Sequence, residues 1–236
     1  MSIIVLRMVV GSLEGVGVAV LYPLFALDAE GRRSARPRVA RGSAAARNPA
    51  SPACAGLVYT RGVKNSEPCP CRSGHPYGAC CRPAHSGAVA PATCGALVRA
   101  RYSAFALGDG EYLYATLAHD HPDRATEPEA VDARIAELSR AGRALKYMGV
   151  VVGDETETEA LFLAKVFERG QDRSFAELST FTRALDGEGG VGGALRYAGG
   201  TLLPRAALPR GMADGAGLRR DDFLALAATH KDTVRS

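Results

Sequence analysis

Apolar residues recur at helical spacing in the middle of the chain and at the alternating spacing of strands after it. Leu97, Arg101 and Phe105 fall on one stripe of a predicted helix, for which Thr93 is a suitable N-cap residue. Gly108 would end this helix, because glycine readily adopts the left-handed conformation of a C-terminal cap. The pattern predicts three helices, over about 93–107, 111–118 and 128–141.

Strand signals follow these helices as short segments rich in Val, Leu, Tyr and Phe. They predict four strands, over 145–153, 157–169, 173–185 and 195–198, and the Gly-Gln-Asp turn at 170–172 predicts a hairpin. Helices that precede an antiparallel meander are typical of the α+β class, with the sheet wrapped on the helices. A further short helix is predicted near 221–229.

The N-terminal quarter differs from the rest in composition. Residues 1–62 hold eight arginines, no lysine and three acidic residues, whereas bases and acids nearly cancel after them. Residues 29–56 consist almost wholly of Ala, Arg, Gly, Pro and Ser, a composition that predicts disorder. We expect residues 1–62 to be a disordered basic extension, or to precede a true translation start at Val63. A basic tail that binds RNA or a membrane is the alternative.

Charge, hydropathy and motifs exclude several classes of function. The balanced charge after residue 62 predicts no specific nucleic-acid binding. The longest charge-free apolar run, residues 15–27, is too short to cross a bilayer, and no clean signal-peptide cleavage site follows it. No nucleophile elbow, phosphate-binding loop or dinucleotide fingerprint occurs in the sequence.

Four cysteines carry the clearest chemical signal. Cys69, Cys71, Cys80 and Cys81 form the pattern C-x-C, eight residues, C-C, which can place four sulfurs around one ion. Four thiolates suit tetrahedral zinc. Four protein ligands leave no open coordination position on the ion, so the zinc would be structural. Persistent thiolates also point to a reducing compartment, which is the cytoplasm.

Alternatives to a four-cysteine zinc site remain open. His75 or His85 could replace a cysteine as the fourth ligand. Disulfides or free thiols are the other reading, although adjacent cysteines such as Cys80 and Cys81 bridge each other only with strain. A segment of about 20 residues cannot bury enough surface to fold alone, which favours a metal.

The cysteine spacing with its Ser-Gly turn resembles the SEC-C motif, named for the C-terminal tail of the SecA translocation ATPase. Residues 90–116, APATCGALVRARYSAFALGDGEYLYAT, resemble the stretch after that motif in YchJ-type proteins. These are small, largely uncharacterised bacterial proteins with a SEC-C segment followed by a nuclear transport factor 2-like domain. The resemblance covers about residues 63–203. It departs from the family at Arg72, where the motif usually has Gly, and at the family's Trp positions, which are vacant.

The resemblance implies a nuclear transport factor 2-like, or cystatin-like, fold: a curved antiparallel sheet packed on helices and preceded by a small zinc-binding module. It divides the chain after the N-terminal extension into a cysteine-rich segment (63–88), a second domain (89–203) and a tail of unknown structure (204–236).

Proteins of this fold often hold a pocket on the concave side of the sheet. Alternation along 173–185 places Glu177, Ser179 and Arg183 on one face, where they could line such a pocket or form a solvated face with an ion pair. Arg101 would be an anion anchor or a buried structural pin. His121 matches the family's His-Pro, or belongs to a polar connector. The candidate pocket residues are Arg101, Tyr102, His121, Glu177, Ser179 and Arg183.

The predicted function is that of a cytoplasmic zinc-binding adaptor. The candidate partner surface is Arg72, His75, Tyr77 and Arg82. By resemblance to the SecA tail, the partner would be an export chaperone or the ribosome, and the second domain would supply a pocket or a homodimer face. The alternative is a small-molecule-binding protein or an enzyme of the hydrolase or isomerase type, with Glu177 as its base. A zinc-stabilised structural domain without a ligand is the third possibility.

Overall fold

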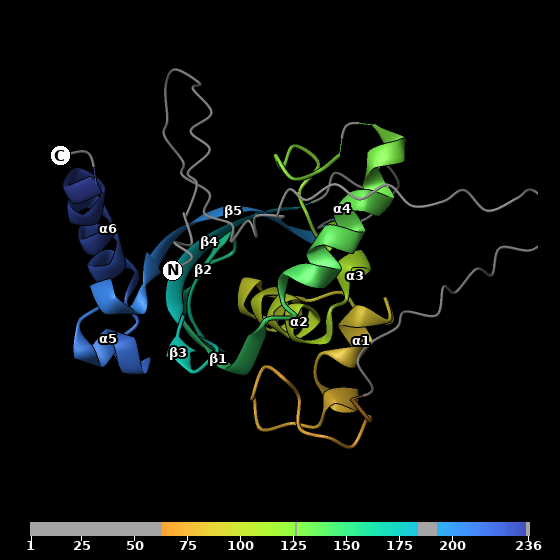
Figure 1. Cartoon of the computed structure of the whole chain (residues 1–236), viewed down its shortest axis with the longest axis horizontal. Coiled ribbons are helices and arrows are strands. Elements are labelled where there is room, and N and C mark those ends of the chain that lie inside the picture. The colour runs from red at the N-terminus through yellow and green to blue at the C-terminus, as the bar shows by residue number, and fades with distance from the viewer. Residues whose placement is uncertain (1–62, 126, 184–192, 235–236) are drawn as a thin grey trace, which may run out of the picture.

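The structure is a computed structural model that describes residues 63–125, 127–183 and 193–234 (Figure 1). Residues 1–62, for which the sequence predicts disorder or a later start at Val63, lie outside the described residues. The last two residues of the predicted strand 173–185 also lie outside them. Among the helices within the described ranges, none is long and apolar enough to cross a membrane.

The three predicted helices of the second domain are α2 (Cys94–Leu107), α3 (Gly110–Ala115) and α4 (Pro128–Ala141). The Thr93 hydroxyl accepts a hydrogen bond from the backbone N–H of Ala96, as expected of an N-cap. The second helix ends three residues earlier than predicted. The reason is a tertiary contact, because the backbone of residues 116–118 hydrogen-bonds with Tyr197 in the last strand instead of continuing the helix.

The strands form one antiparallel sheet, which confirms the predicted α+β class. They are β1 (Leu145–Glu155), β2 (Glu159–Glu168), β3 (Gln171–Asp172), β4 (Phe175–Arg183) and β5 (Leu195–Pro204). The order is β1-β2-β4-β5, and the short β3 pairs with β2 in a hairpin. Its turn lies at residues 169–170 and not at the predicted 170–172, because Gln171 and Asp172 form β3. The sheet curves around α2, which lies on its inner face (Figure 1). Strand β5 is six residues longer than its sequence signal, since paired glycines interrupt the apolar pattern without ending the strand.

Register shifts in β1 and β5 change which side chains face α2. In β1 the register shifts between Tyr147 and Gly149 and again between Val152 and Glu155, and in β5 it shifts opposite the step from Thr180 to Phe181. Gly149 and Gly199 have positive φ angles of 127° and 152°, which glycine adopts without strain. As a result, Tyr197 packs in the core with α2, whereas Leu203 of the same strand packs on the opposite face.

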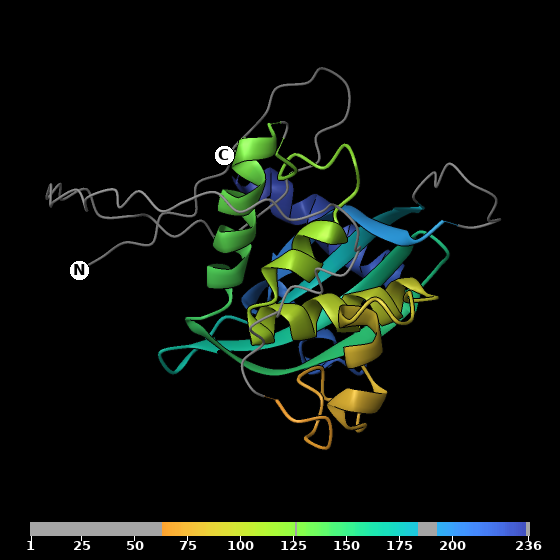
Figure 2. The same ribbon diagram turned by 90° about the vertical axis from the view of Figure 1, so that its right-hand side faces the viewer.

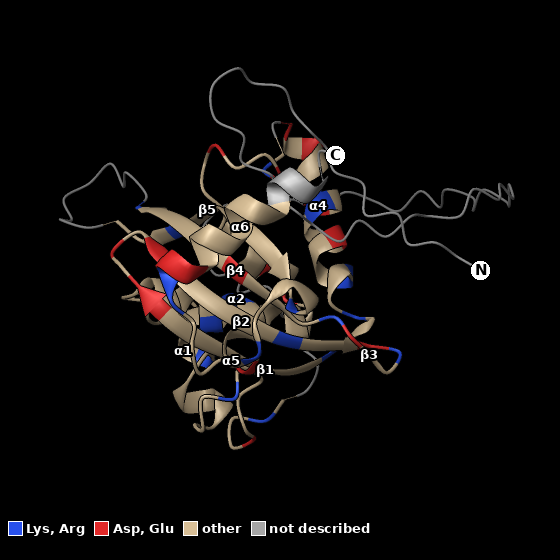
Figure 3. Ribbon diagram, turned by 90° about the vertical axis from the view of Figure 1, so that its left-hand side faces the viewer, with Lys and Arg blue, Asp and Glu red and all other residues tan. Residues whose placement is uncertain are grey.

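The C-terminal tail covers the outer face of the sheet. It forms η2 (Arg205–Ala207), α5 (Arg210–Asp214) and α6 (Arg220–Val234), and α6 contains the predicted helix 221–229. Figure 3 shows α5 and α6 lying across the strands. Their apolar residues pack with Ala176 and Leu178, so this part of the outer face of β4 is buried. A homodimer of this chain could not use this face while the helices cover it.

The cysteine-rich segment (63–88) packs directly on the second domain. It contains η1 (Tyr77–Ala79) and α1 (Arg82–His85), and it lies beside α2 and β1 (Figure 2). The backbone N–H of Val150 in β1 donates to the carbonyl oxygen of Cys71 at 3.2 Å. At Gly149 a Cβ atom would lie 2.9 Å from Cβ of Arg72, so glycine permits this close approach. The buried cysteines and the residues around α2 therefore form one continuous core.

Candidate metal centre

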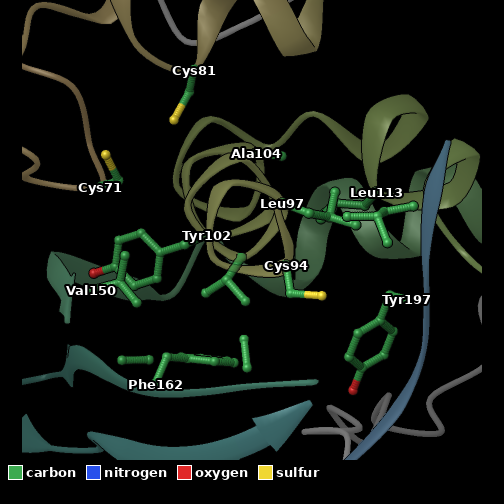
Figure 4. Close-up of a cluster of buried hydrophobic side chains, with 14 of the residues drawn as sticks. Cys71, Cys81, Cys94, Leu97, Tyr102, Ala104, Leu113, Val150, Phe162 and Tyr197 are labelled. Carbon is green, nitrogen blue, oxygen red and sulfur yellow. The ribbon is translucent and has the colours of Figure 1, made fainter. Parts of the chain in front are cut away.

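Short turns place the four cysteines around a common centre. Cys69 and Cys71 occupy a tight turn in which the N–H of Arg72 donates to the Cys69 carbonyl oxygen at 2.9 Å. Arg72 has a φ of 59° there, a conformation that glycine adopts more easily. Cys80 and Cys81 lie between η1 and α1, which brings both sulfurs back toward the first pair. In Figure 4 the sulfurs of Cys71 and Cys81 point toward each other beside α2.

The distances between sulfurs fit one tetrahedral ion. All four Sγ atoms lie within 4.8 Å of one another. The Sγ of Cys71 is 3.5 Å from that of Cys69 and 3.6 Å from that of Cys80, and the Cys80 and Cys81 sulfurs are 3.8 Å apart. Four thiolates at about 2.3 Å from a tetrahedral ion are separated by about 3.8 Å. These four cysteines could therefore hold a metal ion.

Protonation of the cluster also favours a cation. Hydrogen bonding with Cys69 and Cys81 lowers the pKa of Cys71, so this thiol ionises first. Burial raises the pKa of Cys80 to about 11, and hydrogen bonding with Cys69 and Cys71 raises the pKa of Cys81. The protein alone thus favours the ionised form of Cys71 and disfavours that of Cys80 and Cys81. A bound cation would supply the charge needed to ionise Cys80 and Cys81.

Neither candidate histidine belongs to the sulfur cluster. His75 is exposed and lies outside the group of close ligand atoms. His85 uses both ring nitrogens elsewhere, since Nε2 lies 2.9 Å from the Ala100 carbonyl oxygen and Nδ1 lies 2.9 Å from the Tyr77 hydroxyl. A carbonyl only accepts, so Nε2 donates and Nδ1 accepts from Tyr77. Burial lowers the pKa of His85 and favours this neutral ring.

The structure corrects the placement of Tyr77. Its side chain is 5% exposed and packs in the core against His85, so it cannot present a ring to a partner. Arg72, His75 and Arg82 are exposed, as the candidate partner surface requires. Cys94, the fifth cysteine among the described residues, lies apart from the sulfur cluster and donates to the Glu157 carbonyl oxygen.

Four of the six candidate pocket residues come together around Tyr197, a residue that the sequence did not single out. We call Arg101, His121, Glu177, Ser179 and Tyr197 the polar cluster. The Arg101 guanidinium lies over the Tyr197 ring, 4.6 Å from its centroid, and the His121 ring centroid is 5.5 Å from that of Tyr197. The hydroxyls of Tyr197 and Ser179 both donate to Oε1 of Glu177, at 2.9 and 2.6 Å.

Arg101 has the geometry of the buried structural pin, one of the two roles that the sequence left open. Its side chain is 7% exposed, and it donates to the Leu113 carbonyl oxygen and to the Thr116 hydroxyl, which ties α2 to α3. Its charge also lowers the pKa of Glu177, although less than burial raises it. Arg101 is therefore a structural pin whose charge also reaches the polar cluster.

Tyr102 and Arg183 do not belong to the polar cluster. The Tyr102 hydroxyl donates to the Lys165 carbonyl oxygen and accepts from the Gly149 N–H, so it fills the β1 bulge. Figure 4 shows Tyr102 and Tyr197 on opposite sides of α2. Arg183 is exposed at the end of β4 and donates to the carbonyl oxygen of Gly193. Arg101 and Tyr102 are adjacent in α2, so their side chains leave the helix in different directions. The apolar stripe in the sequence did not show which of the two would reach the inner face near Glu177.

Glu177→Gln should stabilise the protein at neutral pH. Burial raises the pKa of Glu177, so the folded state keeps this proton to a higher pH than the unfolded chain does. The stability linked to the proton is present at low pH and is lost as the pH rises through the raised pKa. Glutamine stays neutral throughout, so the gain should appear at neutral pH and shrink near the ordinary glutamate pKa of about 4.3.

Urea unfolding of the wild type and Glu177→Gln, at neutral pH and at about pH 4.3, measures the difference in their free energy of unfolding. A variant that is less stable than the wild type at neutral pH would contradict the prediction and would show that the Arg101 charge outweighs burial. A more stable variant would mean that the chain keeps a costly carboxylate here, which is typical of functional sites.

Two family models match consecutive parts of this chain. Residues 66–83 match the family model of the SEC-C motif, and residues 93–190 match the model described as the YchJ, middle NTF2-like domain. Helices α5 and α6 lie beyond both matches. A solution structure of a SEC-C motif containing protein from Rhodopseudomonas palustris aligns with a TM-score of 0.43 and 27% identity, over 56% of this chain and 95% of that chain.

The chain aligns with most of the length of two curated relatives. A UPF0225 protein of Deinococcus radiodurans is 38% identical over 125 residues, which is 51% of this chain and 83% of the relative. A UPF0225 protein of Sodalis glossinidius is 35% identical over 119 residues, which is 49% of this chain and 75% of the relative. The chain therefore belongs to the UPF0225 family of YchJ-type bacterial proteins.

Proposed function

We propose that this protein is a zinc-stabilised adaptor of the cytoplasm that presents its cysteine-rich segment to a protein partner. The observation that carries the metal part is the set of four cysteine sulfurs within 4.8 Å of one another. Four thiolates suit zinc, and they fill its tetrahedral coordination. A closed site activates no water, so the ion would hold the segment in shape and take no part in a reaction.

The adaptor part rests on what the cysteine-rich segment exposes. Arg72 and Arg82 each follow a ligand cysteine directly, and both are exposed together with His75. A four-thiolate zinc site has a formal charge of about −2, which these two arginines would offset at the surface. Arginines held beside a rigid centre provide fixed hydrogen-bond donors at low entropic cost, which favours recognition. The SEC-C motif supports an export chaperone or the ribosome as the partner.

An affinity pull-down with the full chain tests the adaptor proposal. The surface variant combines Arg72→Asn with Arg82→Ser, because asparagine tolerates the positive φ at position 72. The matched control combines Arg143→Ser with Arg210→Ser, two exposed arginines outside the cysteine-rich segment. We expect the wild type and the control to capture ribosomal proteins or an export chaperone, and the surface variant to capture neither while it keeps one zinc per chain. Equal capture by all three baits would contradict the proposal.

The polar cluster supports a second candidate function, the binding of a small molecule on the inner face of the sheet. The supporting observation is that Arg101, Glu177 and His121 meet around one tyrosine in the interior. An enzyme that uses Glu177 as its base would lose activity in Glu177→Gln and keep it in the surface variant. An adaptor would capture its partner in Glu177→Gln and fail to capture it in the surface variant.

A further inference from the structure

We propose that Ser103 is a positioning residue of the metal centre, so that helix α2 of the second domain completes a site whose ligands all come from the cysteine-rich segment. The inference rests on the metal site of the proposed function and does not depend on the partner. It adds a residue that the cysteine pattern does not contain and that lies 22 positions from the nearest ligand in the chain.

The geometry around Ser103 is specific to the sulfurs. Its side chain is fully buried, and its hydroxyl donates to Sγ of Cys81 at 3.3 Å and lies 3.6 Å from Sγ of Cys69. It therefore contacts one cysteine from each pair. A serine in a helix commonly donates to the carbonyl four residues earlier, here that of Arg99. In this helix Cys81 approaches the Arg99 carbonyl oxygen, at 3.5 Å, and the Ser103 hydroxyl turns to the sulfurs.

The direction of this hydrogen bond follows from the chemistry of a loaded site. A metal-bound cysteine has lost its proton and can only accept, so the serine hydroxyl must donate. A hydrogen bond to an ionised acceptor is stronger than one between neutral groups, and burial strengthens it further. Within the described part of the chain, Ser103 is the one hydroxyl from the second domain that lies within hydrogen-bond distance of a ligand sulfur.

Such a donor should affect both the electronic state of the sulfur and the retention of the ion. It draws negative charge from the thiolate, which stabilises the sulfur lone pairs and reduces its reactivity. It also fixes the Cys81 side chain in the orientation that the ion requires. Groups in this outer position typically change metal affinity by about 10-fold to 100-fold when they are removed.

Cobalt(II) is a suitable probe of the full-length protein, because its spectrum reports directly on thiolate ligands. The variant is Ser103→Ala, which removes only the hydroxyl, and Ser103→Thr is the conservative replacement that keeps it. The control is Cys94→Ala, which removes another buried hydrogen-bonding side chain from the same helix without touching the cluster. The two readouts are the energy of the sulfur-to-cobalt charge-transfer band and the rate of zinc loss to a chromophoric chelator.

We expect Ser103→Ala to bind one cobalt ion, to shift the charge-transfer band to lower energy, and to lose zinc about 10-fold faster than the wild type. Cys94→Ala should match the wild type in both readouts, as should Ser103→Thr where its circular dichroism shows the native fold. A merely structural role of Ser103 would leave the band unchanged in Ser103→Ala.

Wild-type values for the band and the rate in Ser103→Ala would overturn the inference about Ser103. A wild-type protein that binds no cobalt through four thiolates would overturn both this inference and the zinc site of the proposed function. Failure to capture a partner in the pull-down leaves the role of Ser103 intact, so the two proposals fail on different measurements.

Discussion

Replacing Cys71 with serine should remove the bound ion and lower the melting temperature by at least about 10 °C. Cys71 is fully buried and its sulfur lies close to two other ligand sulfurs. Structural zinc contributes about 10–16 kcal/mol to the folding of small zinc-binding peptides, which is comparable to the whole stability of a typical domain. Even a third of that value is a large loss for this chain.

The loss should not stay within the cysteine-rich segment. The buried cysteines share a core with α2, and the Cys71 carbonyl oxygen accepts from β1. Zinc content per chain and thermal unfolding followed by circular dichroism measure the two effects. Cys94→Ala is the control, and it should keep one ion per chain. A Cys71→Ser protein with one tightly bound zinc and an unchanged melting temperature would contradict the four-thiolate site.

Phe223→Ala should destabilise the protein by about 3–5 kcal/mol. Phe223 of α6 is fully buried in the core on the outer face of the sheet, with Leu161, Leu163 and Leu203. Alanine would remove most of the ring volume and leave a cavity between the helix and the strands. The ion pair and backbone bond that Arg220 forms with Glu159 and Asp154 hold only the start of α6, so they cannot close that cavity.

The next residue in the helix provides a matched control. Leu224 is 38% exposed, so Leu224→Ala should change the free energy of unfolding by less than about 0.5 kcal/mol. Urea denaturation of both variants measures the contrast. Similar small effects at both positions would show that the tail is not part of the cooperative fold.

Local patterns in the sequence predicted the helices, the hairpin and the cluster of four cysteines that could hold a metal ion. The four cysteines lie within 13 residues, so their spacing alone brings them near a common centre. Period-two alternation correctly placed Glu177 and Ser179 on the face that meets α2. It could not show that Arg183 would be exposed at the end of its strand. Nor could it show that the bulge in β5 would turn Tyr197 and Leu203 to opposite faces.

The sequence by itself thus determined the α+β class and the grouping of the four cysteines, because both depend on residues close together in the chain. Only the tertiary structure brought Ser103 to Cys81, Tyr197 to Glu177 and the tail to the outer face of the sheet. These contacts join residues that are 20 or more positions apart. Burial, strand register and helix docking select them together, and no short sequence pattern records that choice.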